Sequence, residues 1–279
     1  MLDVQNLSVR FPTPKGVVEA VRGVSFTVGK EKVGIVGESG SGKSTVGRAI
    51  LRLVPRPGVV TATQVGFDGR DMLKLSEREM RQIRGGRISM VMQDPKFSLN
   101  PVMRVGDQIT ETLMHHRRIG RREAKEKALA MLADVKIREP ARVYGTYPHE
   151  VSGGMGQRIM IAMMLVTDPE LLIADEPTSA LDVTVQMQVL AILDDLVSQR
   201  GMGLIFISHD LDLVASFCDR VLIMYAGRIV ESCEAKALSE ARHPYTRGLL
   251  ACLPRIDARS ERLATLQRDP AWISDALTA

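Results

Sequence analysis

The sequence lacks any apolar run that approaches the roughly 18 residues required for a membrane-spanning helix. Its first residues, Met1 to Gln5, also lack the basic stretch and apolar core of a secretory signal peptide. We therefore expect a soluble protein without a signal peptide, and any work at a membrane has to be done together with partner subunits.

Cysteines and aromatic residues are scarce as well. The three cysteines, Cys218, Cys233 and Cys252, do not have the spacing of a metal site, and their odd number argues against a fully paired set of disulfides. We expect them to be reduced thiols, as in a cytosolic protein. Aromatic residues make up 4% of the chain, and the basic clusters at 78–87 and 117–122 are not interleaved with them. A platform for single-stranded nucleic acid needs such interleaving, so we expect no nucleic-acid partner.

A complete phosphate-binding loop (P-loop) is present. Residues 37–44 read GESGSGKS and fit the pattern G-x-x-x-x-G-K-[ST] at every fixed position. The apolar run 33–36 predicts a buried strand before the loop, and residues 45–53 predict a helix after it. Glycines let backbone N–H groups curl around phosphates, and a helix N-terminus adds donors and a positive dipole end. We expect Lys43 to contact the β- and γ-phosphates and Ser44 to offer its hydroxyl to Mg²⁺.

Two further apolar runs end in residues that suit phosphate chemistry. The run 171–174 leads into Asp175, a candidate Mg²⁺ ligand, and Glu176, a candidate general base. The run 203–208 leads into His209, a candidate γ-phosphate contact. Ligands of parallel α/β sheets lie at the carboxyl ends of strands, so we expect these residues and the P-loop to form one site. The alternatives are a buried strand that meets solvent at an acidic turn, and a histidine that is an ordinary satisfied polar residue.

Together with other motifs in the same order, these residues resemble the nucleotide-binding subunit of ABC transporters. The resemblance covers nearly the whole chain, from Asp3 to about Pro254. It implies an ATPase that uses ATP and Mg²⁺. The implied catalytic residues are Glu176, His209 and the Q-loop glutamine, Gln93. The implied metal ligands are Ser44, Gln93 and Asp175. The implied nucleotide contacts are Phe11 as adenine platform, the P-loop residues Gly37, Glu38, Ser39, Gly40, Ser41, Gly42, Lys43, Ser44 and Thr45, and the signature residues Ser152, Gly153 and Gly154.

The signature motif departs slightly from the family's commonest form. This chain has VSGGM where LSGGQ is usual, but the serine and both glycines remain, so we do not expect an inactive site. The motif precedes an apolar stretch, 155–166, that predicts a helix, and it therefore lies at a second anion-binding helix N-terminus. The family explains two phosphate sites in one chain by a head-to-tail dimer in which each ATP contacts both chains. Phe11 could instead be an ordinary core residue.

Several segments are similar to the dipeptide, oligopeptide and nickel importer branch, namely 88–101, 153–158, 175–186 and 243–250. That resemblance implies two integral membrane permease subunits and a second ATPase subunit, which is a paralogue or another copy of this chain. It also implies an extracytoplasmic solute-binding protein and a peripheral location on the cytoplasmic face of the bacterial inner membrane. The expected function is to energise the uptake of peptides or a related small solute such as nickel. The alternative is a soluble ABC-type ATPase that acts on nucleic acid or ribosomes.

The expected fold class is α/β: a P-loop NTPase (RecA-like) core with an antiparallel β subdomain and an inserted helical subdomain. We predict an ABC ATPase domain over 1–230, with the core at 1–92 and 167–230 and the helical subdomain at 94–166. The antiparallel portion is expected from the alternating patterns of 3–11 and 18–28. Residues 117–133 predict one solvated helix that begins after a surface helix end at His115 and His116. Residues 231–279, punctuated by prolines, are expected to be a C-terminal extension that forms an appendage.

Overall fold

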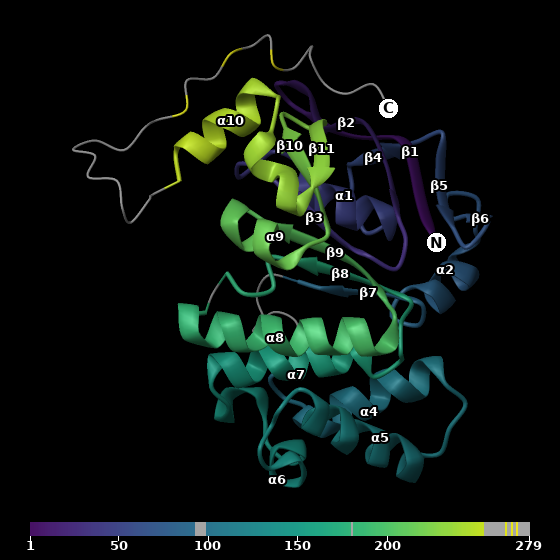
Figure 1. Ribbon diagram of the computed structural model, residues 1–279. Helices are drawn as coiled ribbons and strands as arrows, with labels where there is room; N and C mark the ends of the chain where they lie inside the picture. Colours follow the sequence, from purple (N-terminus) through teal and green to yellow (C-terminus); the bar gives the residue numbers. More distant parts are fainter. Residues whose placement is uncertain (93–98, 180, 254–265, 267–268, 270–271, 273–279) are drawn as a thin grey trace. The chain divides into compact units, whose positions relative to one another are not determined.

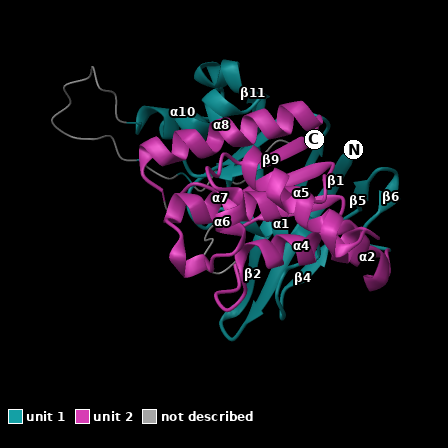
Figure 2. Cartoon of the chain, turned by 90° about the horizontal axis from the view of Figure 1, so that it is seen from below, with its two compact units in different colours: residues 1–74, 206–279 teal, residues 75–205 magenta. Residues whose placement is uncertain are grey.

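The computed structural model describes residues 1–92, 99–179, 181–253, 266, 269 and 272. These residues form two compact units, which Figure 2 shows in different colours: unit 1 comprises residues 1–74 and 206–279, and unit 2 comprises residues 75–205. The boundary between the two units in the sequence, after Ile205, falls within strand β9 (Gly203–Ser208). The subdomain limits predicted from the sequence stay predictions.

Unit 1 contains an antiparallel sheet in which β1 lies between β2 and β5. Its strands are β1 (Leu2–Thr13), β2 (Gly16–Val28), β4 (Val59–Thr61), β5 (Gln64–Phe67) and β6 (Arg70–Asp71). Along β1, buried Leu2, Val4, Leu7 and Val9 are spaced two or three residues apart and separated by more exposed residues. This pattern buries one face of the strand and confirms the expected antiparallel portion.

Unit 1 also contains the strand that leads into the P-loop. In this part β3 (Lys32–Val36) pairs in parallel with β10 (Arg220–Tyr225), which pairs antiparallel with β11 (Arg228–Glu234). The helices are α1 (Lys43–Ile50), α9 (Leu211–Phe217) and α10 (Pro244–Ala251), with a 3₁₀ turn at Ala235–Glu240. Gly34 allows α9 to approach β3, because a Cβ there would lie 2.2 Å from a methyl carbon of Val214.

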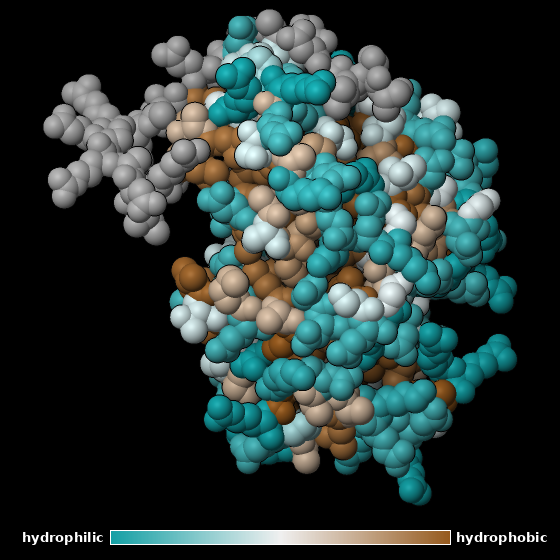
Figure 3. Space-filling view, viewed as in Figure 1, coloured by the Kyte–Doolittle hydropathy of each residue, from teal (hydrophilic) through white to brown (hydrophobic). Residues whose placement is uncertain are grey.

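Unit 2 combines two parallel strands with a group of helices. The strands are β7 (Ile88–Val91) and β8 (Leu171–Asp175). The helices are α2 (Glu77–Ile83), α4 (Val105–His116), α5 (Arg121–Asp134), α6 (Pro140–Tyr144), α7 (Gly153–Leu165) and α8 (Val183–Arg200). Figure 1 shows α7 and α8 side by side. The buried residues of α7 are mostly apolar and lie on several sides of the helix. Hydrophilic side chains predominate over α4 and α5 in the view of Figure 3.

Two sequence predictions are wrong in detail. The helix predicted over 117–133 begins only at Arg121, because the chain is extended at Arg117, whose guanidinium donates a hydrogen bond to the Thr167 carbonyl oxygen at 2.7 Å. The start of the predicted appendage is packed into unit 1, since β11 belongs to the sheet and both Tyr245 and Thr246 are fully buried. Among the described residues, no helix is long and apolar enough to cross a membrane.

Candidate nucleotide site

The P-loop follows β3 and is packed against the backbone of two other strands of unit 1. A Cβ on Gly37 would lie 2.1 Å from the carbonyl oxygen of Met224 in β10. A Cβ on Gly42 would lie 2.3 Å from the carbonyl oxygen of Ala20 in β2. Because backbone atoms cannot move aside as a flexible side chain can, both positions require glycine. The loop is also fixed at Ser41, whose carbonyl oxygen accepts a hydrogen bond from the Gly227 N–H at 3.0 Å.

Lys43 carries a buried positive charge at the centre of this loop. Its side chain is 5% exposed, and its ammonium group donates hydrogen bonds to the carbonyl oxygens of Gly37 at 2.7 Å and Glu38 at 2.8 Å. It is also the first residue of α1, whose N-cap Gly42 has a φ of 101° and offers no capping side chain. The first turn of α1 contains no acidic residue. A helix N-terminus with a fixed cation and no competing carboxylate suits a phosphate group.

Ser41 gives an independent indication that a polar group belongs in the loop. Its hydroxyl oxygen is buried and has no hydrogen-bond partner. A buried hydroxyl without a partner is costly, so such groups normally meet a ligand or water. Ser44 and Thr45 lie half-buried on the first turn of α1, whereas Ser39 and Gly40 are exposed. The donor set of this loop therefore fits the phosphates of a nucleotide.

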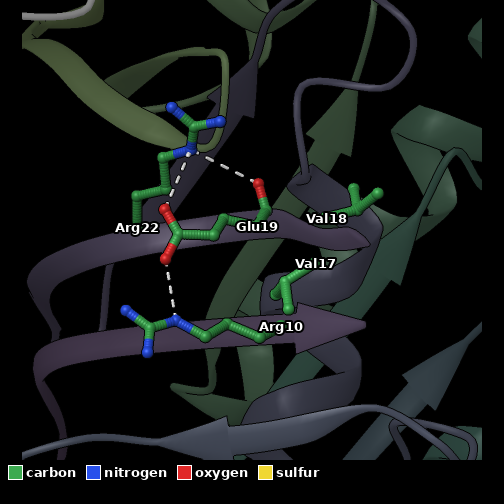
Figure 4. A pocket seen from close by; sticks show the side chains of 5 residues that line it. All are labelled: Arg10, Val17, Val18, Glu19 and Arg22. Atoms are coloured by element: carbon green, nitrogen blue, oxygen red, sulfur yellow. Dashed lines mark hydrogen bonds and ion pairs between the residues drawn. The ribbon is translucent and has the colours of Figure 1, made fainter. Parts of the chain in front are cut away.

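A pocket of about 690 Å³ lies along β1 and β2 in unit 1. Figure 4 shows its lining, in which Glu19 lies between two arginines: its carboxylate accepts a hydrogen bond from Arg10 at 2.7 Å and lies 3.8 Å from Arg22. Val17 and Val18 line the same pocket and are exposed by 63% and 54%. Glu19 directly precedes Ala20, whose carbonyl oxygen meets Gly42 of the P-loop. The sequence analysis missed these residues, which belong to no recognised motif.

The predicted adenine platform, Phe11, is near this pocket. It pairs with Val18 in the register of β1 and β2 and is half-buried. One edge of its ring packs closely on Gly58, where a Cβ would lie 2.7 Å from the ring. Its contact with adenine stays a prediction.

His209 is exposed at the end of β9, in the part that belongs to unit 1. The residues around it are fixed by local hydrogen bonds. The Ser208 hydroxyl accepts from the Asp210 N–H at 3.0 Å, and the Asp210 carboxylate caps α9 by accepting from the Leu213 N–H at 3.0 Å. The histidine is therefore presented on a rigid corner between a buried strand and a capped helix.

Asp175 and Glu176 are presented in unit 2 by the buried strand β8. Asp175 is 3% exposed, and Glu176 is half-buried with a φ of 47°, a left-handed conformation that is uncommon outside glycine. The Glu176 carbonyl oxygen accepts hydrogen bonds from the Ser179 N–H at 3.3 Å and its hydroxyl at 3.2 Å. A strained conformation that its surroundings hold in place is typical of functional positions.

The signature residues lie at the N-terminus of α7, also in unit 2. Ser152 is the N-cap, and its hydroxyl accepts from the Met155 N–H at 3.4 Å. Ser152 and Gly153 are exposed, so this helix terminus is accessible to another molecule. One turn further on, buried Gln157 donates a short hydrogen bond to the Pro177 carbonyl oxygen, next to Glu176. The signature helix and the acidic turn are thus tied together, a link that the sequence analysis did not predict.

Gln93 lies outside the described residues, and its predicted role stays a prediction. Within the described part of the chain, no group of three or more His, Cys, Asp or Glu side chains could hold a metal ion. Mg²⁺ is commonly bound by one or two carboxylates together with substrate phosphates. Asp175 in unit 2 offers a carboxylate and Ser44 in unit 1 a hydroxyl, and their role as metal ligands stays a prediction. The three cysteines are free thiols, as expected.

The family model for ABC transporters matches residues 21–179, more than half of the chain. This chain belongs to the ABC transporter family. The match includes the P-loop, the signature motif and the acidic pair, and it confirms the resemblance stated from the sequence. The chain is therefore an ABC-type ATPase, as expected.

Curated relatives support the same conclusion over nearly the full length. The chain is 48% identical to the oligopeptide transport ATP-binding protein OppD of Bacillus subtilis, over 95% of this chain and 75% of that protein. It is 50% identical to a probable peptide ABC transporter ATP-binding protein of Sinorhizobium fredii, over 98% of this chain and 82% of that protein. It is 45% identical to the dipeptide transport ATP-binding protein DppD of Bacillus subtilis, over 97% of this chain and 82% of that protein.

Solved structures confirm the fold class. This ABC ATPase superposes with a TM-score of 0.75 on the dimeric structure of the bacterial ABC transporter cassette MJ0796. The two share 27% identity, and the comparison covers 85% of this chain and 99% of the cassette. A post-hydrolysis dimeric structure of the same cassette, bound to ADP and Pi, has a TM-score of 0.75 at 26% identity.

Proposed function

We propose that this ABC ATPase is the ATP-binding and ATP-hydrolysing subunit of a membrane importer for peptides or a related small solute. The observation that carries the proposal is the P-loop, in which buried Lys43 and the unpartnered Ser41 hydroxyl create a site for phosphates. Relatives that match nearly the whole chain are named as peptide transport ATP-binding proteins. Those names favour the importer over a soluble ATPase that acts on nucleic acid.

In this proposal the P-loop holds the triphosphate and orders it for attack. Lys43 contacts the β- and γ-phosphates, and the N–H groups at the start of α1 surround them. As the resemblance to the family implies, the Ser44 hydroxyl, the Asp175 carboxylate and Gln93 would hold Mg²⁺, which would neutralise negative charge on the phosphate oxygens.

Glu176 and His209 act on the reacting end of the nucleotide. Glu176 acts as the general base and accepts a proton from the attacking water. A carboxylate is effective in this role when it lies within hydrogen-bond reach of that water. His209 contacts the γ-phosphate from its rigid corner after β9. The adenine and ribose extend toward the pocket lined by Val17 and Val18 on β2, with Phe11 as the aromatic platform.

The exposed turn at Ser152 and Gly153 serves the nucleotide of a second ATPase subunit. A helix N-terminus that is exposed to solvent can bind an anion, and the chain already binds phosphates at its P-loop. In a head-to-tail dimer both sites bind nucleotide, because each ATP contacts the P-loop of one subunit and the signature turn of the other. The second subunit is a paralogue or another copy of this chain. The assembly further includes two integral membrane permease subunits and an extracytoplasmic solute-binding protein. The ATPase is then peripheral, on the cytoplasmic face of the bacterial inner membrane.

The test is reconstitution of the chain with its permease subunits in lipid vesicles. We expect ATP hydrolysis that rises when the solute-binding protein carries a peptide, together with accumulation of that peptide inside the vesicles. Nickel and other small solutes are tested in parallel to define the cargo. ATP hydrolysis that responds to RNA and not to the loaded binding protein would contradict the proposal.

A further inference from the structure

Tyr245, far from the P-loop in the sequence, reaches it in unit 1. It is the second residue of α10, and its side chain is fully buried. Figure 1 shows α10 beside the β10–β11 hairpin, which supplies the residues that hold it. The carboxylate of Glu231 in β11 accepts hydrogen bonds from the N–H groups of Arg242 at 2.6 Å and His243 at 3.3 Å. His243 in turn caps α10, because its Nδ1 accepts from the Tyr245 N–H at 3.1 Å.

The ring of Tyr245 is held by other aromatic rings, independently of its hydroxyl. Its centroid lies 4.5 Å from that of Tyr225 and 5.9 Å from that of Trp272. Tyr225 and Trp272 also contact each other, with centroids 5.9 Å apart. Aromatic contacts of this kind stabilise the position of a ring in addition to the burial of its surface. The substitution Tyr245→Phe therefore retains the packing and removes only the hydroxyl.

That hydroxyl accepts a hydrogen bond from the backbone N–H of Glu38 at 3.1 Å. The Glu38 N–H belongs to the same planar peptide unit as the Gly37 carbonyl, to which Lys43 donates at 2.7 Å. In a trans peptide the N–H and C=O point in opposite directions. Tyr245 therefore holds one side of this peptide unit while the ammonium group of Lys43 holds the other side.

We propose that Tyr245 is a positioning residue for nucleotide binding: it fixes the first peptide unit of the P-loop and thereby the place of the Lys43 ammonium group. The C-terminal segment of the chain thus contributes to ATP affinity without contacting the nucleotide. The inference rests on the proposed role of the P-loop in binding ATP. The role belongs to nucleotide binding, because the contact is made with the backbone of the P-loop.

The test is the variant Tyr245→Phe in the full-length chain, with ATP affinity measured by titration calorimetry. The hydrogen bond is also present without nucleotide, so only the part that orders the P-loop for ATP affects affinity. One net hydrogen bond sets the upper limit, and we expect the Kd for ATP to rise by up to about fivefold. In the assembled transporter the KM for ATP should rise by a similar factor, while kcat stays within about twofold of the wild type. A purely structural hydroxyl would not produce this separation of KM from kcat.

Two matched controls distinguish positioning from a general loss of stability. Thr246→Val removes a buried hydroxyl that has no hydrogen-bond partner from the next position of α10. Tyr144→Phe removes a tyrosine hydroxyl that contacts the Thr110 hydroxyl at 2.8 Å in unit 2. Both should retain the wild-type Kd for ATP, and Tyr144→Phe should lower the unfolding temperature because the buried Thr110 hydroxyl loses this contact.

The outcomes separate this inference from the proposed function. If wild-type protein binds ATP and Tyr245→Phe binds it equally well, the positioning role is wrong. The same conclusion follows if Tyr144→Phe weakens ATP binding as much as Tyr245→Phe, since the effect then reflects stability. If the wild type itself does not bind ATP, the proposed function fails before the question of Tyr245 arises.

Discussion

Removal of the Lys43 ammonium group is the perturbation whose effect follows most directly from the structure. In Lys43→Ala, the carbonyl oxygens of Gly37 and Glu38 lose a charged donor at 2.7 Å and 2.8 Å. The Glu38 carbonyl keeps its hydrogen bond from the Ser41 N–H at 3.1 Å, and the glycines of the loop are untouched. We therefore expect the variant to fold, with only a modest decrease in unfolding temperature.

The effect on nucleotide affinity should be far larger. A hydrogen bond to a charged group contributes about 1.5–3 kcal/mol, and one such bond to phosphate corresponds to a factor of about 10 to 150 in Kd. We expect Lys43→Ala to weaken ATP binding by a factor in this range, as measured by titration calorimetry. Because the ammonium group serves the β- and γ-phosphates, the loss should be greater for ATP than for AMP.

Lys74→Ala is the matched control for the loss of one positive charge. The Lys74 side chain is 84% exposed and pairs with Asp71 at 3.1 Å, and exposed ion pairs contribute little to stability. Its ATP affinity should equal that of the wild type. The reasoning is refuted if Lys43→Ala binds ATP within about twofold of the wild type, or if Lys74→Ala weakens binding equally.

Three further predictions concern catalysis, loop packing and pH. Glu176→Gln should keep its ATP affinity and lose phosphate release by a factor of about 100 or more, because a general base is removed; phosphate release at the wild-type rate would contradict its role. Gly37→Ala should lower the free energy of unfolding by roughly 1–3 kcal/mol, because its Cβ would lie 2.1 Å from the Met224 carbonyl oxygen, whereas Gly29→Ala, with nothing within 4 Å of its Cβ, should not. Burial raises the pKa of Cys218 from 9.0 to about 12, so the native state keeps this proton at pH values where the unfolded chain releases it. This contribution to the free energy of unfolding is present below about pH 9 and is lost as the pH rises toward 12. In denaturant titrations over this range, the free energy of unfolding of Cys218→Ala should fall less than that of the wild type. An equal fall in both proteins would refute the raised pKa of Cys218.

The parts of the site that local sequence patterns encode were predictable. The strand before the P-loop, the helix after it and the helix start at the signature motif all follow from short runs of apolar residues, glycines and caps. The structure has β3 at Lys32–Val36, α1 at Lys43–Ile50 and α7 from Gly153, within a few residues of the predicted ranges. The ABC transporter family was likewise predictable, because several motifs occur in one order.

Contacts between distant backbone segments were not predictable. The carbonyl oxygens of Ala20 and Met224 lie close to the P-loop glycines. Every residue has a carbonyl group, so no residue type in the sequence indicates such a contact. Tyr245 belongs to a recognised segment, yet the sequence does not say that its hydroxyl meets Glu38. The helix end at His116 was predicted, but the gap over 117–120 was not, because charged residues continue through it, and Gly120 just before Arg121 was the available signal.

The central claim is that ATP bound at the P-loop of one ATPase subunit is also contacted by Ser152 of the other ATPase subunit. We propose to attach a photoreactive group to Ser152→Cys in the assembled transporter, in a Glu176→Gln background without the native cysteines, and to identify the crosslinked peptide by mass spectrometry. With ATP and Mg²⁺, the account predicts a crosslink to the P-loop peptide of the neighbouring ATPase chain, which disappears without nucleotide. Crosslinks confined to the labelled chain, or the same products with and without ATP, would contradict it.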